Sequence, residues 1–466
     1  MWPAWLLTGW LCSLSQGMRL SGYRLMVDAG SSGSRLQMFR WAEDGRLTEV
    51  MPSAADERAG AFRLSPGLSS YAATPGLAGR SLQPLLDAAA QYIPEAEQSE
   101  TPLWVKSTAG MRYTSSEDAL AIAEALKVYL SDRSHCPFKF MSYHILSGTQ
   151  EAVFAYITVQ TLLGRGADHG ILELGGASTQ VAFASQVDVR NYEAKFYLHG
   201  TRQSVYATSY SGFGTSKALA RAKVLAVAAS PGLSGVGFPC YHAGYNETTI
   251  VGGRAVFLRG TGNATGCAEL TRRLLHPGYE CTLPPCAVSG RHMPRLSGPF
   301  VALSAFWRAA MKLGLLSGKE SRRLTPGQVR AAAIAICEKS LDRAVAERHS
   351  PWKFQYSACF DGFLVWNLMR AYGFAEDSTD VTYAGFINGV AIGWSMGAII
   401  YEEDNPVAMP NTSSSARALV AWQCLSAGLG FGLCAALCCL LRRRGRAAAP
   451  NFAGGAKKFV DAEALE

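Results

Sequence analysis

Charge is scarce in this sequence, and its small positive excess is not evenly spread. Charged residues make up 17% of the 466 residues, whereas hydrophobic residues make up 48%. The formal net charge is +8, and residues 442–466 hold +3 of it, with six Lys/Arg against three Asp/Glu. The remaining excess forms no basic stripe of the kind that binds nucleic acid, so no nucleic-acid partner is expected.

The sequence also has little that indicates a zinc site or covalent catalysis. None of its 12 cysteines belongs to a CxxC that pairs with a second CxxC or with close histidines, which argues against structural zinc. No Ser/His/Asp arrangement is evident, so a covalent nucleophile is not indicated. Spacing makes three disulfides reasonable in the body, with Cys136 left over: Cys240–Cys267, Cys281–Cys286 and Cys337–Cys359.

Long uncharged runs are few, and one of them is long enough to cross a membrane. Residues 418–441 are 24 residues without a charge, and RRRGR follows at once. The length predicts a transmembrane helix, and the arginines favour a cytoplasmic tail at residues 442–466. The alternative is a buried helix of a soluble core. Association of copies through this helix, as homo-oligomers, is an open expectation.

The N-terminal run WPAWLLTGWLCSLS is uncharged but only some 14 residues long. It favours a signal peptide over residues 1–17, with a short signal anchor as the alternative. Three sequons, at Asn246, Asn263 and Asn411, are typical of an extracellular or lumenal body that carries glycans. We expect a plasma-membrane protein, with the Golgi or another endomembrane as the alternative.

The stretch LMVDAGSSGSRLQMF, Leu25 to Phe39, places a small turn with an acid at its edge between two apolar runs. Gly30 and Gly33 permit positive φ, and few side chains cover the amides of the turn. Consecutive amides can hold phosphate oxygens, and Asp28 can hold the counter-cation. The alternative is an ordinary Gly-Ser hairpin loop.

The same plan returns at GILELGGASTQVAFA, which begins at Gly170. Here the acid is Glu173 and the small turn runs from Gly175 to Ser178, so the two acids are 173 − 28 = 145 residues apart. This repetition predicts two lobes of similar build, each offering a phosphate-binding turn and an acid to a shared cleft.

Three further motifs lie between and after these turns: KSTAGMR, SGTQEAVFAY and GWSMG. Each has a structural interpretation when taken alone. Lys106 and Arg112 can be solvated, Glu151 can belong to an exposed first helical turn, and Trp394 can lie in the core.

In order along the chain, DAGSSGSR, KSTAGMR, SGTQEAVFAY, ELGGASTQ and GWSMG resemble the five apyrase conserved regions of the nucleoside triphosphate diphosphohydrolases, the membrane-anchored ecto-apyrase family. The resemblance runs from about Tyr23 to about Met409. It implies a two-lobed α/β fold of the actin and heat-shock ATPase (RNase H-like) superfamily, with a nucleotide cleft between the lobes. Lobe I would hold residues 20–138 and 380–408, and lobe II would hold residues 139–379.

The resemblance also implies roles for individual residues. Glu151 would be the catalytic base, and Ser178 and Gln180 would orient the attacking water. Asp28 and Glu173 would hold Ca²⁺ or Mg²⁺ through water, and the family's disulfide pairing supports the three pairs above. The phosphate-binding residues would be Ser31, Ser32, Gly33 and Ser34 in the first turn, Gly175, Gly176 and Ala177 with Ser178 in the second, and Thr108 and Ala109 beside the terminal phosphate.

The implied activity is hydrolysis of nucleoside tri- and diphosphates outside the cytosol, assisted by a divalent cation. Such chemistry needs charge neutralisation, an aligned water and a group that accepts its proton. Two alternatives share the fold: a phosphotransferase or ATP-driven switch, and a catalytically weak membrane glycoprotein. Glu173 keeps the last alternative open, because the family usually has Asp at this position and the extra methylene moves the carboxylate by about 1.5 Å.

Overall fold

The computed structural model describes most of the chain between Gly22 and Asn405, which belongs to a compact unit with limits Met1–Asn405. In this part of the chain, no helix is both long and apolar enough to cross a membrane. Several predicted features lie outside the described residues: the leader at 1–17, Ser31, Asn411, the transmembrane helix at 418–441 and the tail at 442–466. The described residues are 22–30, 32–51, 60–164, 166–185, 192–230, 235–275, 280–348 and 352–405.

The first sheet is built around β1, which pairs antiparallel with β2 and parallel with β5. Its strand order within the described residues is β3-β2-β1-β5-β6, with β4 paired to β2. β1 and β5 carry near-continuous apolar runs, as expected of central strands that are covered on both faces. The strands are β1 (Gly22–Ala29), β2 (Ser34–Trp41), β3 (Leu47–Val50), β4 (Arg63–Leu64), β5 (Pro102–Ser107) and β6 (Lys139–Ile145).

Helices cover one face of this sheet. Because side chains alternate along a strand, Leu25 and Val27 share a face that packs against apolar residues of α3 and α6, such as Leu85 and Leu126. The helices that follow these first strands are α2 (Ala78–Ser81), α3 (Gln83–Ala90), α4 (Glu95–Gln98), α5 (Ala109–Arg112) and α6 (Ser116–Ser131).

The second sheet repeats the arrangement around β7, which is antiparallel to β8 and parallel to β14. The strand order, counted over the described residues, is β15-β16-β14-β7-β8-β10-β9. The strands are β7 (Gly170–Leu174), β8 (Ser178–Ala184), β9 (Glu193–Leu198), β10 (Thr201–Ser211), β14 (Phe300–Ser304), β15 (Arg322–Arg323) and β16 (Val381–Tyr383).

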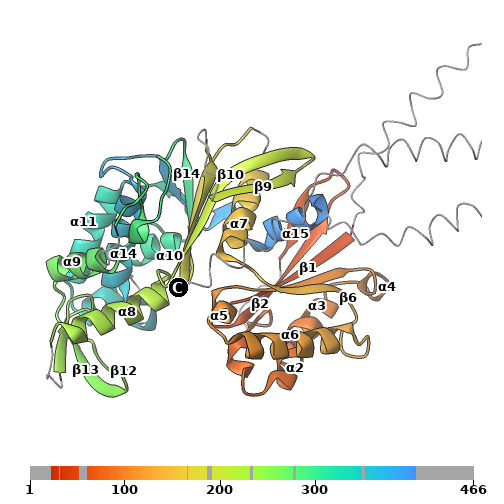
Figure 1. Ribbon diagram of the computed structural model, residues 1–466, viewed down its shortest axis with the longest axis horizontal. Helices are drawn as coiled ribbons and strands as arrows, with labels where there is room; N and C mark the ends of the chain where they lie inside the picture. Colours follow the sequence, from red (N-terminus) through yellow and green to blue (C-terminus); the bar gives the residue numbers. More distant parts are fainter. Residues whose placement is uncertain are drawn as a thin grey trace, which may run out of the picture. The chain divides into compact units, whose positions relative to one another are not determined.

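Two helices, α7 (Gly148–Leu163) and α15 (Ser395–Asp404), join the two sheets. One apolar cluster contains residues of both helices together with Met26 of the first sheet and Ile171 of the second. The helices cross closely, since a Cβ on Gly397 would lie 1.9 Å from the carbonyl oxygen of Phe154. Figure 1 shows α7 and α15 side by side, beside β9 and β1.

Ion pairs fasten α15 to the first sheet. Glu402 lies 2.5 Å from the Nζ of Lys106, and Glu403 lies 2.6 Å from the Nε of Arg24. Lys106 is only 1% exposed, so the interpretation of this lysine as solvated is wrong. Trp394, at the start of α15, is buried, which confirms its assignment to the core.

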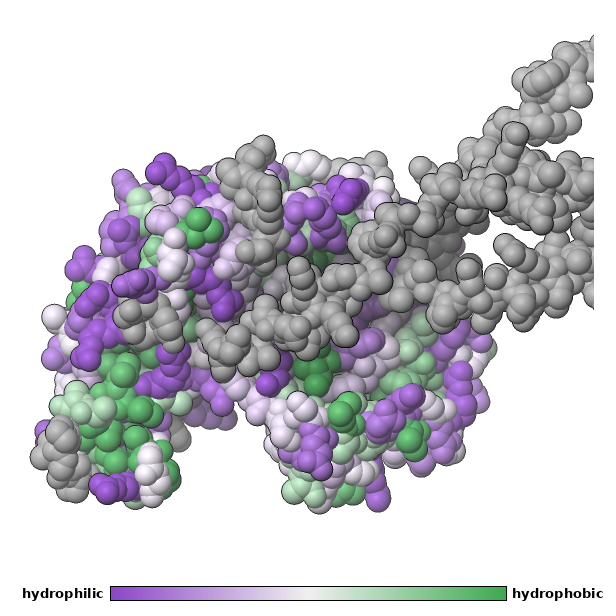
Figure 2. All heavy atoms as spheres, viewed as in Figure 1, coloured by the Kyte–Doolittle hydropathy of each residue, from purple (hydrophilic) through white to green (hydrophobic). Residues whose placement is uncertain are grey.

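A smaller three-stranded sheet, made of β11, β12 and β13, and several helices complete the second half of the unit. Hydrophobic side chains gather on the surface over α8 (Thr215–Ala228), β12 (Asn246–Val251) and β13 (Arg254–Gly260) in Figure 2. In these two strands Ile250 is 68% exposed and Phe257 is 44% exposed. The elements are α8 (Thr215–Ala228), β11 (Gly235–Phe238), β12 (Asn246–Val251), β13 (Arg254–Gly260), α9 (Ala264–Leu275), α10 (Ala305–Lys312), α11 (Pro326–Cys337), α12 (Leu341–Arg348), α13 (Trp352–Gln355), α14 (Ala358–Tyr372), β17 (Phe386–Ile387) and β18 (Val390–Ala391).

The predicted disulfides are confirmed. The three pairs are Cys240–Cys267, Cys281–Cys286 and Cys337–Cys359, and Cys136 is a buried free thiol. The sequon residues Asn246 and Asn263 are both exposed, and their glycosylation stays a prediction.

Strand pairing crosses the predicted lobe limits at two points. β6 begins at Lys139, after the predicted end of the first part of lobe I, yet it pairs with β5 in the first sheet. β16 lies within residues 380–408, predicted as the return to lobe I, yet it pairs with β14 in the second sheet. The first sheet therefore extends to Ile145, and the lobe limits themselves remain a prediction.

Candidate active site

The two small-residue turns have the same local geometry. In the first, the N–H of Gly30 donates to the carbonyl of Gly33 at 2.9 Å, and in the second the N–H of Gly175 donates to the carbonyl of Ser178 at 2.9 Å. Each turn joins two antiparallel strands, as the repeated strand–turn–strand pattern predicts.

One of the two reasons predicted for the glycines of the first turn, a positive φ, is wrong. Neither Gly30 nor Gly33 adopts a positive φ. Instead, a Cβ on Gly33 would lie 2.2 Å from the carbonyl oxygen of Leu64 in β4. Position 33 therefore requires glycine because the backbone of a neighbouring strand approaches it, which is a tertiary constraint.

The start of α8 supports the second turn. The backbone N–H of Thr215 donates to the carbonyl of Gly175 at 3.0 Å, and that of Ser216 donates to the carbonyl of Gly176 at 2.8 Å. A Cβ on Gly214 would lie 2.4 Å from the backbone nitrogen of Ala177, so the two segments are in close contact. These contacts hold the turn in one conformation, which a preorganised anion site needs.

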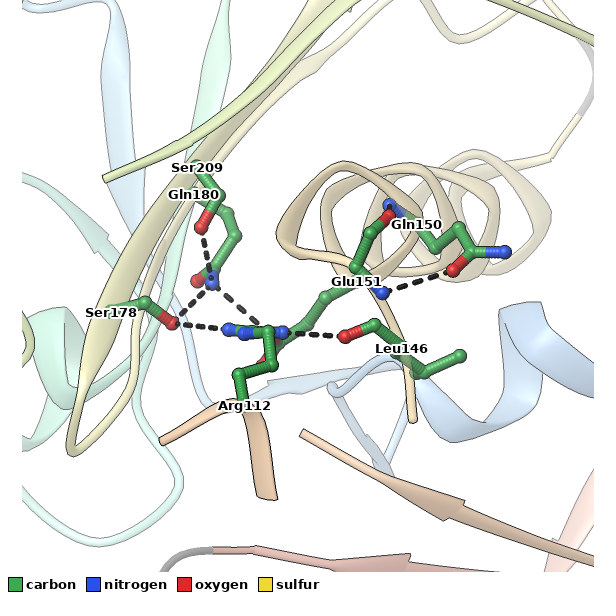
Figure 3. A network of polar contacts seen from close by, with 8 residues as sticks. Arg112, Leu146, Gln150, Glu151, Ser178, Gln180 and Ser209 are labelled. Atoms are coloured by element: carbon green, nitrogen blue, oxygen red, sulfur yellow. Dashed lines mark hydrogen bonds and ion pairs between the residues drawn. The ribbon is translucent and has the colours of Figure 1, made fainter. Parts of the chain in front are cut away.

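Glu151, the predicted base, lies in the first turn of α7, which begins with a capping box between Ser147 and Gln150. Its side chain is buried, only 6% of the residue being exposed, so the interpretation as an exposed helix-start carboxylate is wrong. Both terminal nitrogens of Arg112 donate to Oε2 of Glu151 at 3.2 Å. Figure 3 shows these two side chains pointing toward each other.

Ser178 and Gln180 meet the same pair from β8. The Nε2 of Gln180 donates to Oε2 of Glu151 at 3.2 Å and to Oγ of Ser178 at 2.6 Å, and Arg112 donates to Oγ of Ser178 at 3.1 Å (Figure 3). The Oε1 of Gln180 is buried and has no hydrogen-bond partner among the described residues. Gln180 thus hydrogen-bonds to both of the other predicted site residues, Glu151 and Ser178, and keeps an acceptor atom available to a water.

Sequence reasoning missed two residues of this network, Arg112 and Ser209. Ser209 of β10 accepts a hydrogen bond from Nε2 of Gln180 at 3.2 Å. Its side chain also lies against the start of α7, since a Cβ on Gly148 would come 2.3 Å from its Oγ. KSTAGMR contains the arginine, but nothing local in that motif indicates that it contacts Glu151.

Burial raises the pKa of three carboxylates in this site, and neighbouring carboxylates add to the rise at Glu151 and Glu173. Burial raises the pKa of Glu151 to about 6; Arg112 opposes the rise, and the charge of Asp28 adds to it. Burial also raises the pKa of Glu173, and the charges of Glu151 and Asp28 add to that rise. For Asp28, burial raises the pKa, and the guanidinium of Arg35 opposes the rise. A cation beside these groups would stabilise their charged forms.

Asp28 and Glu173 fit a hydrated divalent cation. Glu173 is 5% exposed; its Oε1 accepts from the Oγ of Ser304 at 3.2 Å, while its Oε2 is buried without a hydrogen-bond partner in the described structure. Over the described residues, no group of three or more His, Cys, Asp or Glu side chains forms a complete metal site. Two carboxylates suit a Ca²⁺ or Mg²⁺ ion that takes its other ligands from water and phosphate oxygens.

The remaining predicted phosphate residues border the first turn. The N–H of Thr108 donates to the carbonyl of Ala29 at 3.3 Å, which places KSTAGMR beside the end of β1. Thr108 and Ala109 are buried, at 8% and 5% exposed, whereas Ser32 is exposed and Ser34 is buried at the start of β2. Their contact with phosphate remains a proposal.

Comparison with known proteins identifies the family. A model of the GDA1/CD39 (nucleoside phosphatase) family matches residues 19–413. The chain belongs to this family. The predicted resemblance to the nucleoside triphosphate diphosphohydrolases is therefore confirmed, and this GDA1/CD39 member carries its two turns and Glu151 inside the matched region.

Individual relatives agree with this assignment. Human ectonucleoside triphosphate diphosphohydrolase 2 is 28% identical over 466 residues, which cover 92% of this chain and 92% of the relative. Bovine ectonucleoside triphosphate diphosphohydrolase 8 is 27% identical over 420 residues, which cover 81% of this chain and 82% of the relative.

A solved structure supports the fold. The crystal structure of nucleoside triphosphate hydrolases from Neospora caninum matches with a TM-score of 0.56 at 14% identity, covering 85% of this chain and 95% of that one. The GDA1/CD39 chain thus has the predicted α/β fold of the actin-like ATPases; the C-terminal transmembrane helix in that prediction lies outside the described residues.

Proposed function

We propose that this nucleoside phosphatase hydrolyses nucleoside tri- and diphosphates to monophosphate and phosphate, by attack of water on the terminal phosphate with Glu151 as general base. The observation that carries the proposal is the network of Glu151, Arg112, Ser178 and Gln180 beside the second turn. The names of the relatives support the same substrate class.

Glu151 is suited to accept a proton from water at neutral pH. Burial raises its pKa to about 6, so it is ionised at pH 7 and yet more basic than an ordinary carboxylate. Arg112 stabilises the ionised form and holds the carboxylate in place. The unpartnered Oε1 of Gln180 and the hydroxyl of Ser178 are suited to orient the water for in-line attack.

The two turns are suited to hold the phosphates. Backbone amides of both turns, with Thr108 and Ala109, would bind phosphate oxygens, while Asp28 and Glu173 would hold Ca²⁺ or Mg²⁺ through water. Such a cation neutralises phosphate charge and thereby favours departure of the leaving nucleotide.

The proposal includes the setting of the enzyme. Residues 418–441 would anchor the chain, with the body outside the cytosol, at the plasma membrane or an endomembrane, and with the tail cytoplasmic. Homo-oligomers through this helix belong to the same proposal. Disulfides in the body agree with an oxidising compartment.

The test measures phosphate release from nucleoside tri-, di- and monophosphates, with Ca²⁺ or Mg²⁺ and with no acceptor present, by the purified full-length protein and its Glu151→Gln variant. We expect hydrolysis of the tri- and diphosphates and a fall in turnover of roughly 10²–10⁴-fold in the variant, the usual contribution of a general base. Nucleotide affinity should persist.

The same assay separates the alternatives. A phosphotransferase or an ATP-driven switch would release little phosphate without its acceptor or partner, and a catalytically weak glycoprotein would bind nucleotide without hydrolysis. Turnover of the Glu151→Gln variant within about threefold of the parent would contradict the proposed mechanism, because that loss is too small for a general base.

A further inference from the structure

The amide nitrogen of Gln180 faces three acceptors but carries only two hydrogens. Its Nε2 lies 2.6 Å from Oγ of Ser178, and 3.2 Å from both Oε2 of Glu151 and Oγ of Ser209 (Figure 3). At most two of these contacts can be full hydrogen bonds at one time. The position of each acceptor therefore decides how the amide turns, and with it where the buried Oε1 of Gln180 points.

Ser209 lies where β10 becomes an edge of the second sheet. β9 pairs with β10 from Thr201 to Tyr206, so beyond Tyr206 the side of β10 away from β8 has no strand neighbour among the described residues. In this stretch Arg291 supplies a contact. Its Nη1 donates to the carbonyl oxygen of Ser209 at 3.0 Å, and the central carbon of its guanidinium lies 5.7 Å from the ring centroid of Tyr210. Arg291 thus holds the backbone of a residue whose hydroxyl faces the amide of the site.

The turn that carries Arg291 is itself anchored. The N–H of Ala287 donates to the carbonyl of Arg291 at 2.8 Å, and the N–H of Arg291 donates to the carbonyl of Val288 at 3.2 Å. Ala287 and Val288 are both buried. The hydroxyl of Tyr206 donates to the carbonyl oxygen of His292 at 2.9 Å, so the turn is tied to β10 at a second point. An arginine on so well-held a turn can fix the strand residue that it contacts.

We propose that Arg291 is a positioning residue for hydrolysis: it holds Ser209, and Ser209 turns the amide of Gln180 so that Oε1 faces the attacking water. This inference rests on the proposed function, in which Gln180 orients that water. In this role Arg291 acts through Ser209 and contacts neither the nucleotide nor the water. Its loss should therefore slow the chemical step and leave substrate binding nearly unchanged.

The test measures kcat and KM for phosphate release from a nucleoside triphosphate, with Mg²⁺ present, by the full-length protein and its Arg291→Met variant. We expect kcat to fall about 5- to 10-fold while KM changes less than about twofold, because a misdirected water slows the chemical step alone. Arg291→Lys keeps a donor on a long side chain and should recover part of the loss. An equilibrium titration with nucleotide counts the protein that is able to bind, so that unfolded protein is not mistaken for slow enzyme.

A double-mutant cycle shows whether Arg291 acts through Ser209. Ser209→Ala removes the hydroxyl but keeps the Cβ that lies against Gly148 of α7, and it should lower kcat by a similar factor. Adding Arg291→Met to Ser209→Ala should then lower kcat less than about twofold further, because the same interaction is already lost. A merely structural role of Arg291 would let the two losses multiply.

Arg133→Met is the matched control. Arg133 also donates to a backbone carbonyl, that of Pro137 at 2.9 Å, but it follows α6 and has no contact with the network, so kcat and KM should stay unchanged. Losses that multiply in the double variant, or a kcat of Arg291→Met within about twofold of the parent, would overturn the inference. Failure of the proposed function would show separately, as absent phosphate release by the parent enzyme.

Discussion

Arg112 places two nitrogens at 3.2 Å from a single carboxylate oxygen of Glu151, although the residues are 39 positions apart in the sequence. Arg112 follows the strand β5 of the first sheet, and Glu151 begins the helix α7 that joins both sheets. The pair therefore fixes the proposed base relative to the first sheet and α7, and Arg112 keeps the pKa of Glu151 lower than burial alone would make it.

The pH dependence of hydrolysis should follow Glu151. Since burial raises its pKa to about 6, the base is protonated and inactive below that pH, and kcat/KM should fall as the pH drops through about 6. Above this pH the carboxylate is ionised and the rate should level off. Initial rates at saturating cation measure the profile. A bound cation lowers the pKa of Glu151 and moves the limb toward lower pH, so a rate that shows no acidic limb at all would contradict the assignment.

Removing the charge of Arg112 should move that acidic limb to higher pH. Arg112 lowers the pKa of Glu151, so Arg112→Met leaves a carboxylate that holds its proton more tightly. Turnover near pH 7 should fall by about 10- to 100-fold, because the base is both protonated and misplaced. Arg112→Lys keeps the charge and should hold the limb near its original pH while turnover falls. An unmoved limb in the Met variant would contradict this role.

The negative charge of Glu173 should matter more for hydrolysis than the length of its side chain. Glu173→Asp should retain activity if the carboxylate still reaches the water shell of the cation, whereas Glu173→Ala should lose most of it, with an apparent cation affinity about 10- to 100-fold weaker. The rate of phosphate release, measured as Ca²⁺ or Mg²⁺ is titrated, gives both the activity and the apparent cation affinity of each variant. Ser304→Ala, which removes only the hydrogen bond to Oε1, is the milder control. Full activity of the Ala variant would remove Glu173 from the site.

The crossing of α7 and α15 should not tolerate a side chain at Gly397. A Cβ there would lie 1.9 Å from the carbonyl oxygen of Phe154, and the N–H of Gly397 donates to Oγ1 of Thr158 at 2.8 Å. Gly397→Ala should therefore lower the free energy of unfolding by about 1–3 kcal/mol or more. Thermal or denaturant unfolding measures the change.

A matched control lies four residues earlier in the same motif. A Cβ on Gly393 meets nothing within 4 Å, and its φ is not in the left-handed region, so Gly393→Ala should leave stability nearly unchanged. Similar losses in the two variants would show that the close helix crossing is not what makes Gly397 necessary.

Much of the site could be predicted because its parts are local in sequence. An apolar run, an acid and a run of small residues specify a strand, a carboxylate and an open turn whatever the rest of the chain does, and DAGSSGSR and ELGGASTQ form such units. The position of Glu151 at a helix start also follows from SGTQE, because Ser147 and Gln150 form a capping box within four residues.

The tertiary structure alone decided which charged residues are buried and what they contact. The sequence allows Arg112 and Lys106 to be solvated, because an isolated charge favours water. In the structure each lies against a carboxylate that is distant in the chain: Arg112 pairs with Glu151, and Lys106 pairs with Glu402. Gly33 likewise looks in the sequence like a flexible turn residue. In the structure, glycine is required at this position because the carbonyl oxygen of Leu64 in β4 leaves no room for a side chain. Sequence periodicity reports the apolar faces and turns of neighbouring residues. The partners of a buried charge and the close contacts of a glycine depend on segments that meet only when the two sheets pack around α7 and α15.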